Sequence, residues 1–157
     1  NQVEADMIAA MVERIFRQAD RFDYSATVGV IVPYRNQIAT VRNAIDRYGI
    51  PALHSITIDT VERFQGSQRD YIIYGLTVQQ RYQLNFLTDN VFEEDGTLID
   101  RKLNVAMTRA RKHLTIVGNP DILAGSAVYR RLMDFMKSRG CYFNVACEKF
   151  CAGDFSV

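Results

Sequence analysis

The run VGVIVPYRNQ at residues 28–37 joins a short apolar segment to a proline and a group of polar side chains. A continuous apolar segment of this length, closed by Pro33, is typical of a β-strand that is buried on both faces. Such strands occur in parallel sheets that helices cover on each side. The run therefore predicts the centre of an α/β domain, with Tyr34 and Arg35 immediately after the strand.

Helical patterns flank this strand on both sides. Residues 3–20 carry apolar side chains at the i, i+3, i+4 spacing of an amphipathic helix, and a second such pattern begins at Ile38 and is stopped by Gly49. The alternation continues to the end of the chain and predicts a parallel sheet with helices on both faces, whose ligands lie beyond the carboxyl ends of the strands. The further strands are predicted at residues 56–60, 71–77, 114–118 and 141–145, and the further helices at 103–112 and 128–137.

The stretch 88–100 breaks this alternation. It is polar and acidic, so we expect a surface hairpin or loop there. The 157 residues are enough for one domain of ordinary size. The 19 basic and 18 acidic residues give a net charge of +1, which by itself implies neither nucleic acid nor a membrane as a partner.

The ends of the chain carry few signals. Three cysteines, Cys141, Cys147 and Cys151, have spacings that do not match a zinc knuckle, and we expect free thiols. No apolar run approaches the roughly 20 residues that a membrane span needs, and the first residues lack the pattern of a signal peptide. Because position 1 is not methionine either, we expect residues 1–157 to be a single domain of a longer cytoplasmic protein.

The segment LNVAMTRAR at residues 103–111 places Arg109 and Arg111 at the end of a predicted helix. Helical residues two apart do not share a face, so one arginine can point away from the fold while the other pairs locally. The guanidinium fork matches phosphate oxygens and stabilises the charge that builds up during phosphoryl transfer. Taken alone, however, two ordinary surface arginines are the simpler interpretation.

Two further segments carry candidate groups. In TVERFQGSQRD at residues 60–70, Gly66 permits a close backbone approach and Gln65 can orient a water or a phosphate. After the first strand, Tyr34 can stack on a base or ribose and Arg35 can meet a phosphate. A plain turn and an ordinary helix start explain the same residues when each segment is considered separately.

Together and in this order, the segments resemble the motor motifs of superfamily 1B helicases. Residues 28–37 resemble motif IV, an apolar strand followed by Pro-Tyr and a Gln. Residues 60–70 are similar to motif V with its Phe-Gln-Gly core, and residues 103–111 to motif VI, Leu-Asn-Val-Ala-x-Thr-Arg-Ala-Arg. Residues 86–88 look like the Gly-Phe-Leu element that precedes motif VI. The nearest branch contains the RNA-surveillance helicase and the replication nuclease-helicase.

The resemblance implies the second, C-terminal RecA-like domain of the helicase motor. Its partner is the N-terminal RecA-like domain of the same full-length chain, which carries the P-loop and the Mg²⁺ ligands, and ATP lies between the two. Arg109 would then be the arginine finger at the γ-phosphate, and Gln65 would assist catalysis. The remaining nucleotide contacts implied by the motifs are Gly66, Gln68, Arg35 and Arg111.

The resemblance also implies a nucleic-acid track. Pro33, Tyr34 and Thr60 would face a single strand and grip its backbone. Since DNA and RNA share the phosphate backbone, both remain open as substrates. A 5′ to 3′ polarity follows from the resemblance alone.

Two positions depart from the family pattern. Gln68 stands where the family usually has a Glu that contacts the nucleotide ribose, and an amide makes this hydrogen bond without the strength of a charge. Ile38 stands where some relatives carry an arginine after the motif IV Gln, so we assign that role to Arg35.

Two alternative interpretations remain. A flavodoxin-like or receiver-type binding domain explains the α/β pattern, but it does not explain Phe-Gln-Gly and Arg-Ala-Arg at these positions. A non-catalytic docking domain of helicase ancestry is the second alternative, and Gln68 is its only hint in the sequence.

We predict that residues 1–157 alone show no ATPase activity that nucleic acid stimulates. No glycine in the chain is followed by lysine, so the P-loop pattern is absent, and no apolar strand ends in an Asp-Glu pair for Mg²⁺. The measurement is phosphate release with and without single-stranded DNA or RNA. Turnover near that of an intact helicase, with contaminating ATPase excluded, would contradict this prediction.

Overall fold

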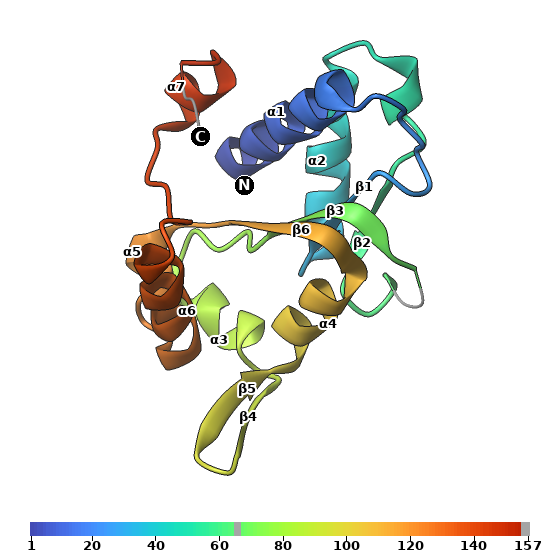
Figure 1. Cartoon of the computed structure of the whole chain (residues 1–157). Helices are drawn as coiled ribbons and strands as arrows, with labels where there is room; N and C mark the ends of the chain where they lie inside the picture. The colour runs from blue at the N-terminus through green and yellow to red at the C-terminus, as the bar shows by residue number, and fades with distance from the viewer. Residues whose placement is uncertain (65–66, 155–157) are drawn as a thin grey trace.

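Four strands form a parallel sheet in the order β2-β1-β3-β6 in the computed structural model, which describes residues 1–64 and 67–154 (Figure 1). β1 (Val28–Val32) pairs with β2 (Thr57–Thr60) on one side and with β3 (Arg69–Gly75) on the other. β3 also pairs with β6 (Ala110–Val117). Because all four strands run in one direction, the sheet has one carboxyl edge and one amino edge.

Helices α1 (Gln2–Gln18) and α2 (Arg35–Asp46) cover one face of the sheet (Figure 1). α1 begins at Asn1, whose side chain accepts a hydrogen bond from the Glu4 backbone N–H at 3.1 Å. After α2, the short 3₁₀ helix η1 (Pro51–Leu53) leads into β2. The core on this face includes Ile8, Val12, Val28, Val30, Val41, Ile45 and Ile73.

The opposite face carries a second helical layer. It consists of α3 (Arg81–Leu87), α4 (Arg101–Arg109), α5 (Pro120–Leu123) and α6 (Ala127–Ser138) (Figure 1). Its separate core includes Ile31, Ile72, Tyr74, Leu87, Leu103, Ala106 and Tyr129. The predicted α/β fold, with a parallel sheet between two layers of helices, is confirmed.

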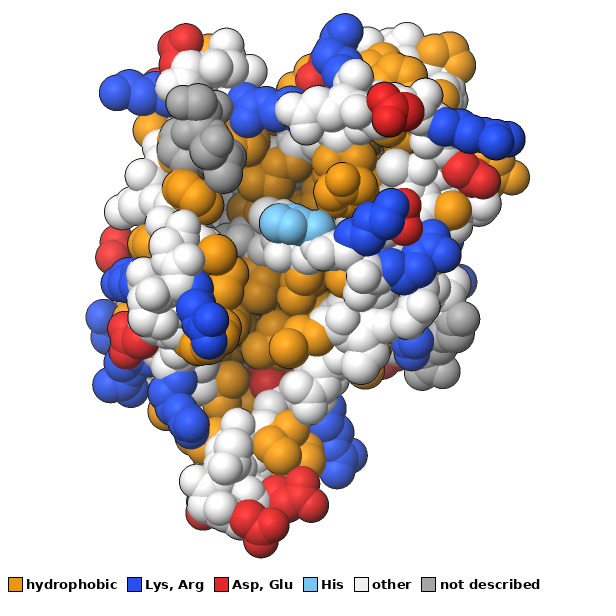
Figure 2. All heavy atoms as spheres, viewed as in Figure 1, with side chains coloured by type: hydrophobic (Ala, Val, Ile, Leu, Met, Phe, Trp, Pro, Cys, Tyr) orange, Lys and Arg blue, Asp and Glu red, His pale blue; other side chains and the backbone are white. Residues whose placement is uncertain are grey.

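The acidic stretch folds as an antiparallel hairpin of β4 (Val91–Glu94) and β5 (Thr97–Asp100), which stands out from the helical layers (Figure 1). Asp95 and Gly96 form its turn with φ angles of 51° and 74°, and an Asp-Gly pair favours such a turn. Acidic side chains gather at its tip (Figure 2). The expected surface hairpin is therefore confirmed.

Asp100 joins the hairpin to α4 and α6. It is buried, and its carboxylate accepts hydrogen bonds from the backbone N–H groups of Lys102 at 2.8 Å and Leu103 at 3.1 Å, which caps α4. The Tyr129 hydroxyl donates to its other oxygen at 3.0 Å. Burial raises the pKa of Tyr129, so the phenol remains a donor. The entry to α4 is therefore fixed by contacts with two other elements.

One predicted helix boundary and one predicted strand are wrong. The helix expected at 103–112 ends at Arg109, because the chain turns extended at Ala110 and pairs with Arg69 of β3. The strand expected at 141–145 is absent, and those residues lead instead to the short helix α7 (Cys147–Cys151), which packs against α1. An apolar pattern alone cannot supply the partner strand that such a segment needs.

Among the helices of the described residues, none is long and apolar enough to cross a membrane. Cys141, Cys147 and Cys151 are free thiols, as expected from their spacing.

Glu4 is a buried carboxyl group that ties α1 to the end of β3. Only 3% of its surface is exposed. The Thr77 backbone N–H donates to one oxygen at 2.7 Å, and the Asn1 side chain donates to the other at 3.2 Å. Burial raises the pKa of Glu4 to about 8.

We predict that the free energy of unfolding falls as the pH rises from about 4.5 to about 8. The unfolded chain releases the Glu4 proton near pH 4.5, whereas the folded chain holds it to about pH 8, so deprotonation favours unfolding within this window. Glu4→Gln should remove on the order of 4 kcal/mol of this change. Urea unfolding at pH 5 and pH 8.5 measures it, with Glu94→Gln at the hairpin as the control. Equal pH dependence in Glu4→Gln and the unaltered chain would show the prediction to be wrong.

Candidate functional site

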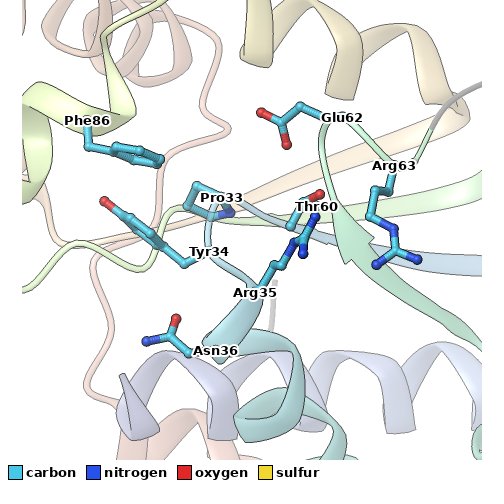
Figure 3. A pocket seen from close by; sticks show the side chains of 8 residues that line it. All are labelled: Pro33, Tyr34, Arg35, Asn36, Thr60, Glu62, Arg63 and Phe86. Atoms are coloured by element: carbon cyan, nitrogen blue, oxygen red, sulfur yellow. The ribbon is translucent and has the colours of Figure 1, made fainter.

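A hollow lies at the carboxyl edge of the sheet, where β1 and β2 end side by side with Val32 opposite Thr60. Its volume is about 490 Å³. The lining comes from the ends of β1 and β2, the start of α2 and the exposed side of α3 (Figure 3). The lining residues are Pro33, Tyr34, Arg35, Asn36, Thr60, Glu62, Arg63 and Phe86.

The structure brings together four of the sequence-predicted residues in this hollow: Pro33, Tyr34, Arg35 and Thr60. Pro33 and Thr60 are buried, whereas Arg35 is exposed at the first position of α2. No hydrogen bond or ion pair engages the Arg35 guanidinium within the described part of the chain. The hollow therefore combines an aromatic ring, a free cation and a threonine.

The Tyr34 ring is held in place from α3. Its hydroxyl donates to the backbone oxygen of Gln83 at 3.2 Å, and its ring stacks on Phe86 with 5.0 Å between centroids. Burial raises the pKa of Tyr34, which keeps the phenol neutral. The sequence indicated Tyr34 but gave Phe86 no role, since the signal for Phe86 was only its place in a short Phe-Leu-Thr element.

Gln37, the glutamine of the Pro-Tyr segment, turns away from the hollow. Its amide donates to the Asn1 backbone oxygen at 2.9 Å, and its oxygen accepts from the Asn1 nitrogen at 3.0 Å. With 2% exposure it is buried beneath α1. Its role in this structure is to anchor the start of α1.

Arg109 lies at the opposite, amino edge of the sheet. It is the last residue of α4 and directly precedes Ala110, which pairs with Arg69 at the beginning of β3. The expectation that ligands of the sheet lie beyond its carboxyl edge does not hold for Arg109, because α4 crosses the face of the sheet before the chain enters β6. Strands of this length separate the two edges by roughly 15 Å.

The Arg109 side chain is half buried. Its Nε atom is buried with no hydrogen-bond partner among residues 1–64 and 67–154. An unpaired buried donor costs free energy comparable to that of a lost hydrogen bond, so the group is suited to a partner that binds later.

Arg111 is engaged in a different way. It belongs to β6, so the two arginines do not share the helix that the sequence predicted. Its guanidinium pairs with Asp70 at 3.0 Å and donates to the Ala26 backbone oxygen at 3.0 Å. Lys112 pairs with the same carboxylate at 3.0 Å, and these contacts, the Lys112 hydrogen bond first, lower the pKa of Asp70.

The segment after β2 connects the two edges. Phe64 anchors it: the ring is 1% exposed, and a Cβ on Gly29 would lie 2.6 Å from that ring. Gln68 donates its amide to the Thr108 backbone oxygen at 3.1 Å, beside the end of α4. Gln65 and Gly66 lie outside the described residues. Across the described part of the chain, no cluster of His, Cys, Asp and Glu suits a metal ion.

The family described as the AAA domain matches residues 1–121, which include the sheet, the hollow and α4. Several similar proteins are named as helicases or as regulators of nonsense transcripts. The chain belongs to the AAA-domain family of superfamily 1B helicases. The motif resemblance inferred from the sequence is thus confirmed.

Three relatives of this helicase domain define the extent of the match. Helicase sen1 of Schizosaccharomyces pombe is 32% identical over 141 residues, covering 88% of this chain and 8% of that protein. ATP-dependent helicase NAM7 of Saccharomyces cerevisiae is 28% identical over 145 residues, covering 90% of this chain and 14% of that protein. The regulator of nonsense transcripts 1 homolog of Arabidopsis thaliana is 34% identical over 118 residues, covering 73% of this chain and 9% of that protein. The chain therefore spans a small part of each relative.

We predict that Phe64→Ala lowers the free energy of unfolding of the helicase domain by about 3 kcal/mol or more, since it leaves a cavity under the segment that joins the edges. Phe64→Leu should cost less because it fills more of the space. Chemical unfolding measures both. Phe135→Ala, which removes a ring that is 53% exposed, should have little effect. A cost for Phe64→Ala as small as for Phe135→Ala would be inconsistent with this anchoring role.

Proposed function

We propose that residues 1–157 are the second motor domain of an ATP-dependent helicase. In this proposal a first RecA-like domain holds ATP and Mg²⁺, and the present domain closes on it to complete the nucleotide site. Hydrolysis then reopens the two domains, and alternating grip on the single strand moves the motor. The name of the NAM7 relative, an ATP-dependent helicase, is consistent with this assignment.

The observation that carries the proposal is the contrast between two neighbouring arginines. Arg111 is fully committed to Asp70 and to the Ala26 backbone. Arg109 has a buried Nε with no partner among the described residues, at the end of a rigid helix. A guanidinium that is positioned but unpaired can take a γ-phosphate without breaking an existing contact, and it stabilises the charge of phosphoryl transfer.

The other nucleotide contacts divide by position. Gln68 lies beside the end of α4, so its amide is near enough to Arg109 to serve the same nucleotide, although it must first leave the Thr108 carbonyl. Gln65 and Gly66 belong to the same segment, and we propose that they approach the phosphates. We propose Arg111 as a support for this group through Asp70 rather than as a finger.

The strand contacts belong to the hollow. We propose that Pro33, Tyr34 and Thr60 grip the backbone of single-stranded DNA or RNA there. Arg35 is our candidate for a second phosphate-binding arginine, with the condition that its phosphate lies in the hollow rather than beside Arg109. Arg35 is exposed, and its guanidinium has no partner among the described residues, which supports this role.

The segment between β2 and β3 is suited to couple the two sites. It leaves the hollow at Thr60, is fixed in the middle by Phe64 and reaches the end of α4 through Gln68. A shift of this segment on nucleotide binding would change both ends at once. The two sites are separated by roughly 15 Å, and this segment alone is long enough to connect them.

We predict that Arg109→Ala in the full-length protein lowers kcat for ATP by roughly 10³-fold or more, with nucleotide binding much less affected, because the finger acts on the transition state. Steady-state ATPase assays with saturating single strand measure kcat, and a fluorescent nucleotide measures binding.

Arg101→Ala is the matched control, since Arg101 is an exposed arginine at the other end of α4. It should leave kcat nearly unchanged. If Arg109→Ala also keeps its rate, the finger role fails and a non-catalytic docking domain becomes the better interpretation.

A further inference from the structure

An aromatic pair lies on the α3 side of the hollow. The rings of Tyr34 and Phe86 stack at 5.0 Å between centroids with planes 24° apart, and Figure 3 shows them together on one side of the hollow. Phe86 is 49% exposed, so much of this aromatic surface faces solvent. A single exposed phenylalanine is ordinary, but this ring stacks on a second aromatic ring that lines the same hollow, which makes the pair a candidate contact surface.

The pair is held rigidly by groups below it. Lys102 is 4% exposed, and its ammonium lies 4.5 Å from the Phe86 ring centroid. The same ammonium donates to the Phe86 backbone oxygen at 3.2 Å and pairs with Asp89 at 3.0 Å. A lysine is rarely buried unless it is paired, and here its contacts fix the end of α3 on which Phe86 is displayed.

The surroundings of the pair select the kind of ligand. Arg35 and Arg63 line the opposite side of the hollow, and Glu62 is the acidic side chain of the lining (Figure 3). Aromatic faces beside cations in an open groove are the combination with which proteins bind single-stranded nucleic acid, because bases stack while phosphates meet the cations. An apolar peptide would leave the arginines without partners.

We propose that Tyr34 and Phe86 form a stacking platform for one base of the bound single strand. This inference rests on the proposed function and extends it, because it adds a base contact to the backbone grip. It also gives a role to α3, whose last residues belong to the Phe-Leu-Thr element that the resemblance left without one. Tyr34 and the Lys102 ammonium both contact the Phe86 ring, so the base stacks on the Tyr34 ring from the hollow and packs against the exposed part of Phe86. Every base has a π face, so the platform accepts all bases.

The test measures single-strand binding by the full-length protein. Phe86→Ala should weaken binding of a fluorescent oligoadenylate about tenfold, and Phe86→Leu, which retains apolar volume without a ring, should weaken it by a similar factor. Phe86→Trp should bind as tightly as the unaltered protein, because it keeps an aromatic ring. ATPase assays should show a higher KM for the strand with kcat at saturating strand unchanged, because the platform binds and does not catalyse.

Two controls separate stacking from general damage. Phe135→Ala removes a ring that is also about half exposed and also lies near a cation, Arg139, and it should leave binding unchanged. A strand with consecutive abasic sites keeps the backbone but lacks bases, so the unaltered protein and Phe86→Ala should bind it equally.

Three outcomes would overturn the platform. If Phe86→Ala binds oligoadenylate with the unaltered affinity, Phe86 does not contact the strand. If Phe86→Ala loses as much affinity for the abasic strand, the loss comes from a changed shape of the hollow and not from a lost base contact. Unaltered binding of oligoadenylate by Phe86→Leu would show that apolar volume, and not stacking of an aromatic ring, is what the strand needs. Failure of the proposed function is distinct: the unaltered protein would then bind no single strand, or Arg109→Ala would keep its ATPase rate.

Discussion

β1 contributes to both hydrophobic cores at the same time. Val28, Val30 and Val32 point into the core under α1 and α2, whereas Ile31 points into the core with α4 and α6. Neighbouring strands pair with β1 on both sides, so it is also closed to solvent at its edges. This double burial sets the register in which Val32 and Thr60 end together, and the hollow exists because they do.

The parts of the fold that follow from local chemistry could be predicted from the sequence. The local sequence alone predicts the amphipathic helix α1, the buried strand β1 and the Asp-Gly turn of the hairpin. The end of α4 is different, because residues 110–112 leave the helix only through pairing with β3 across the sheet. The position of Arg109 was misjudged for the same reason, since the direction in which α4 crosses the sheet is a property of the packed domain.

The candidate site shows the same division. Pro33, Tyr34, Arg35 and Thr60 follow strands that lie next to each other, and the rule for the carboxyl ends of parallel strands was enough to group them. Phe86 was missed because its helix is short and its partners, Tyr34 and Lys102, are distant in sequence. The difference between Arg109 and Arg111 likewise depends on Asp70. This carboxylate pairs with Arg111 only once the chain has folded.

The hairpin of β4 and β5 is a self-contained extension of the domain. Its two strands bond to each other, its tip is exposed, and Asp100 secures its base to α4 and Tyr129. Asp95 and Gly96 lie at the far end of the hairpin from Asp100. We therefore expect changes in length or sequence there to leave the start of α4 in place. The tip is consequently a natural attachment point for a fluorophore or a tether, from which motion of this domain could be followed in real time while its motifs remain untouched.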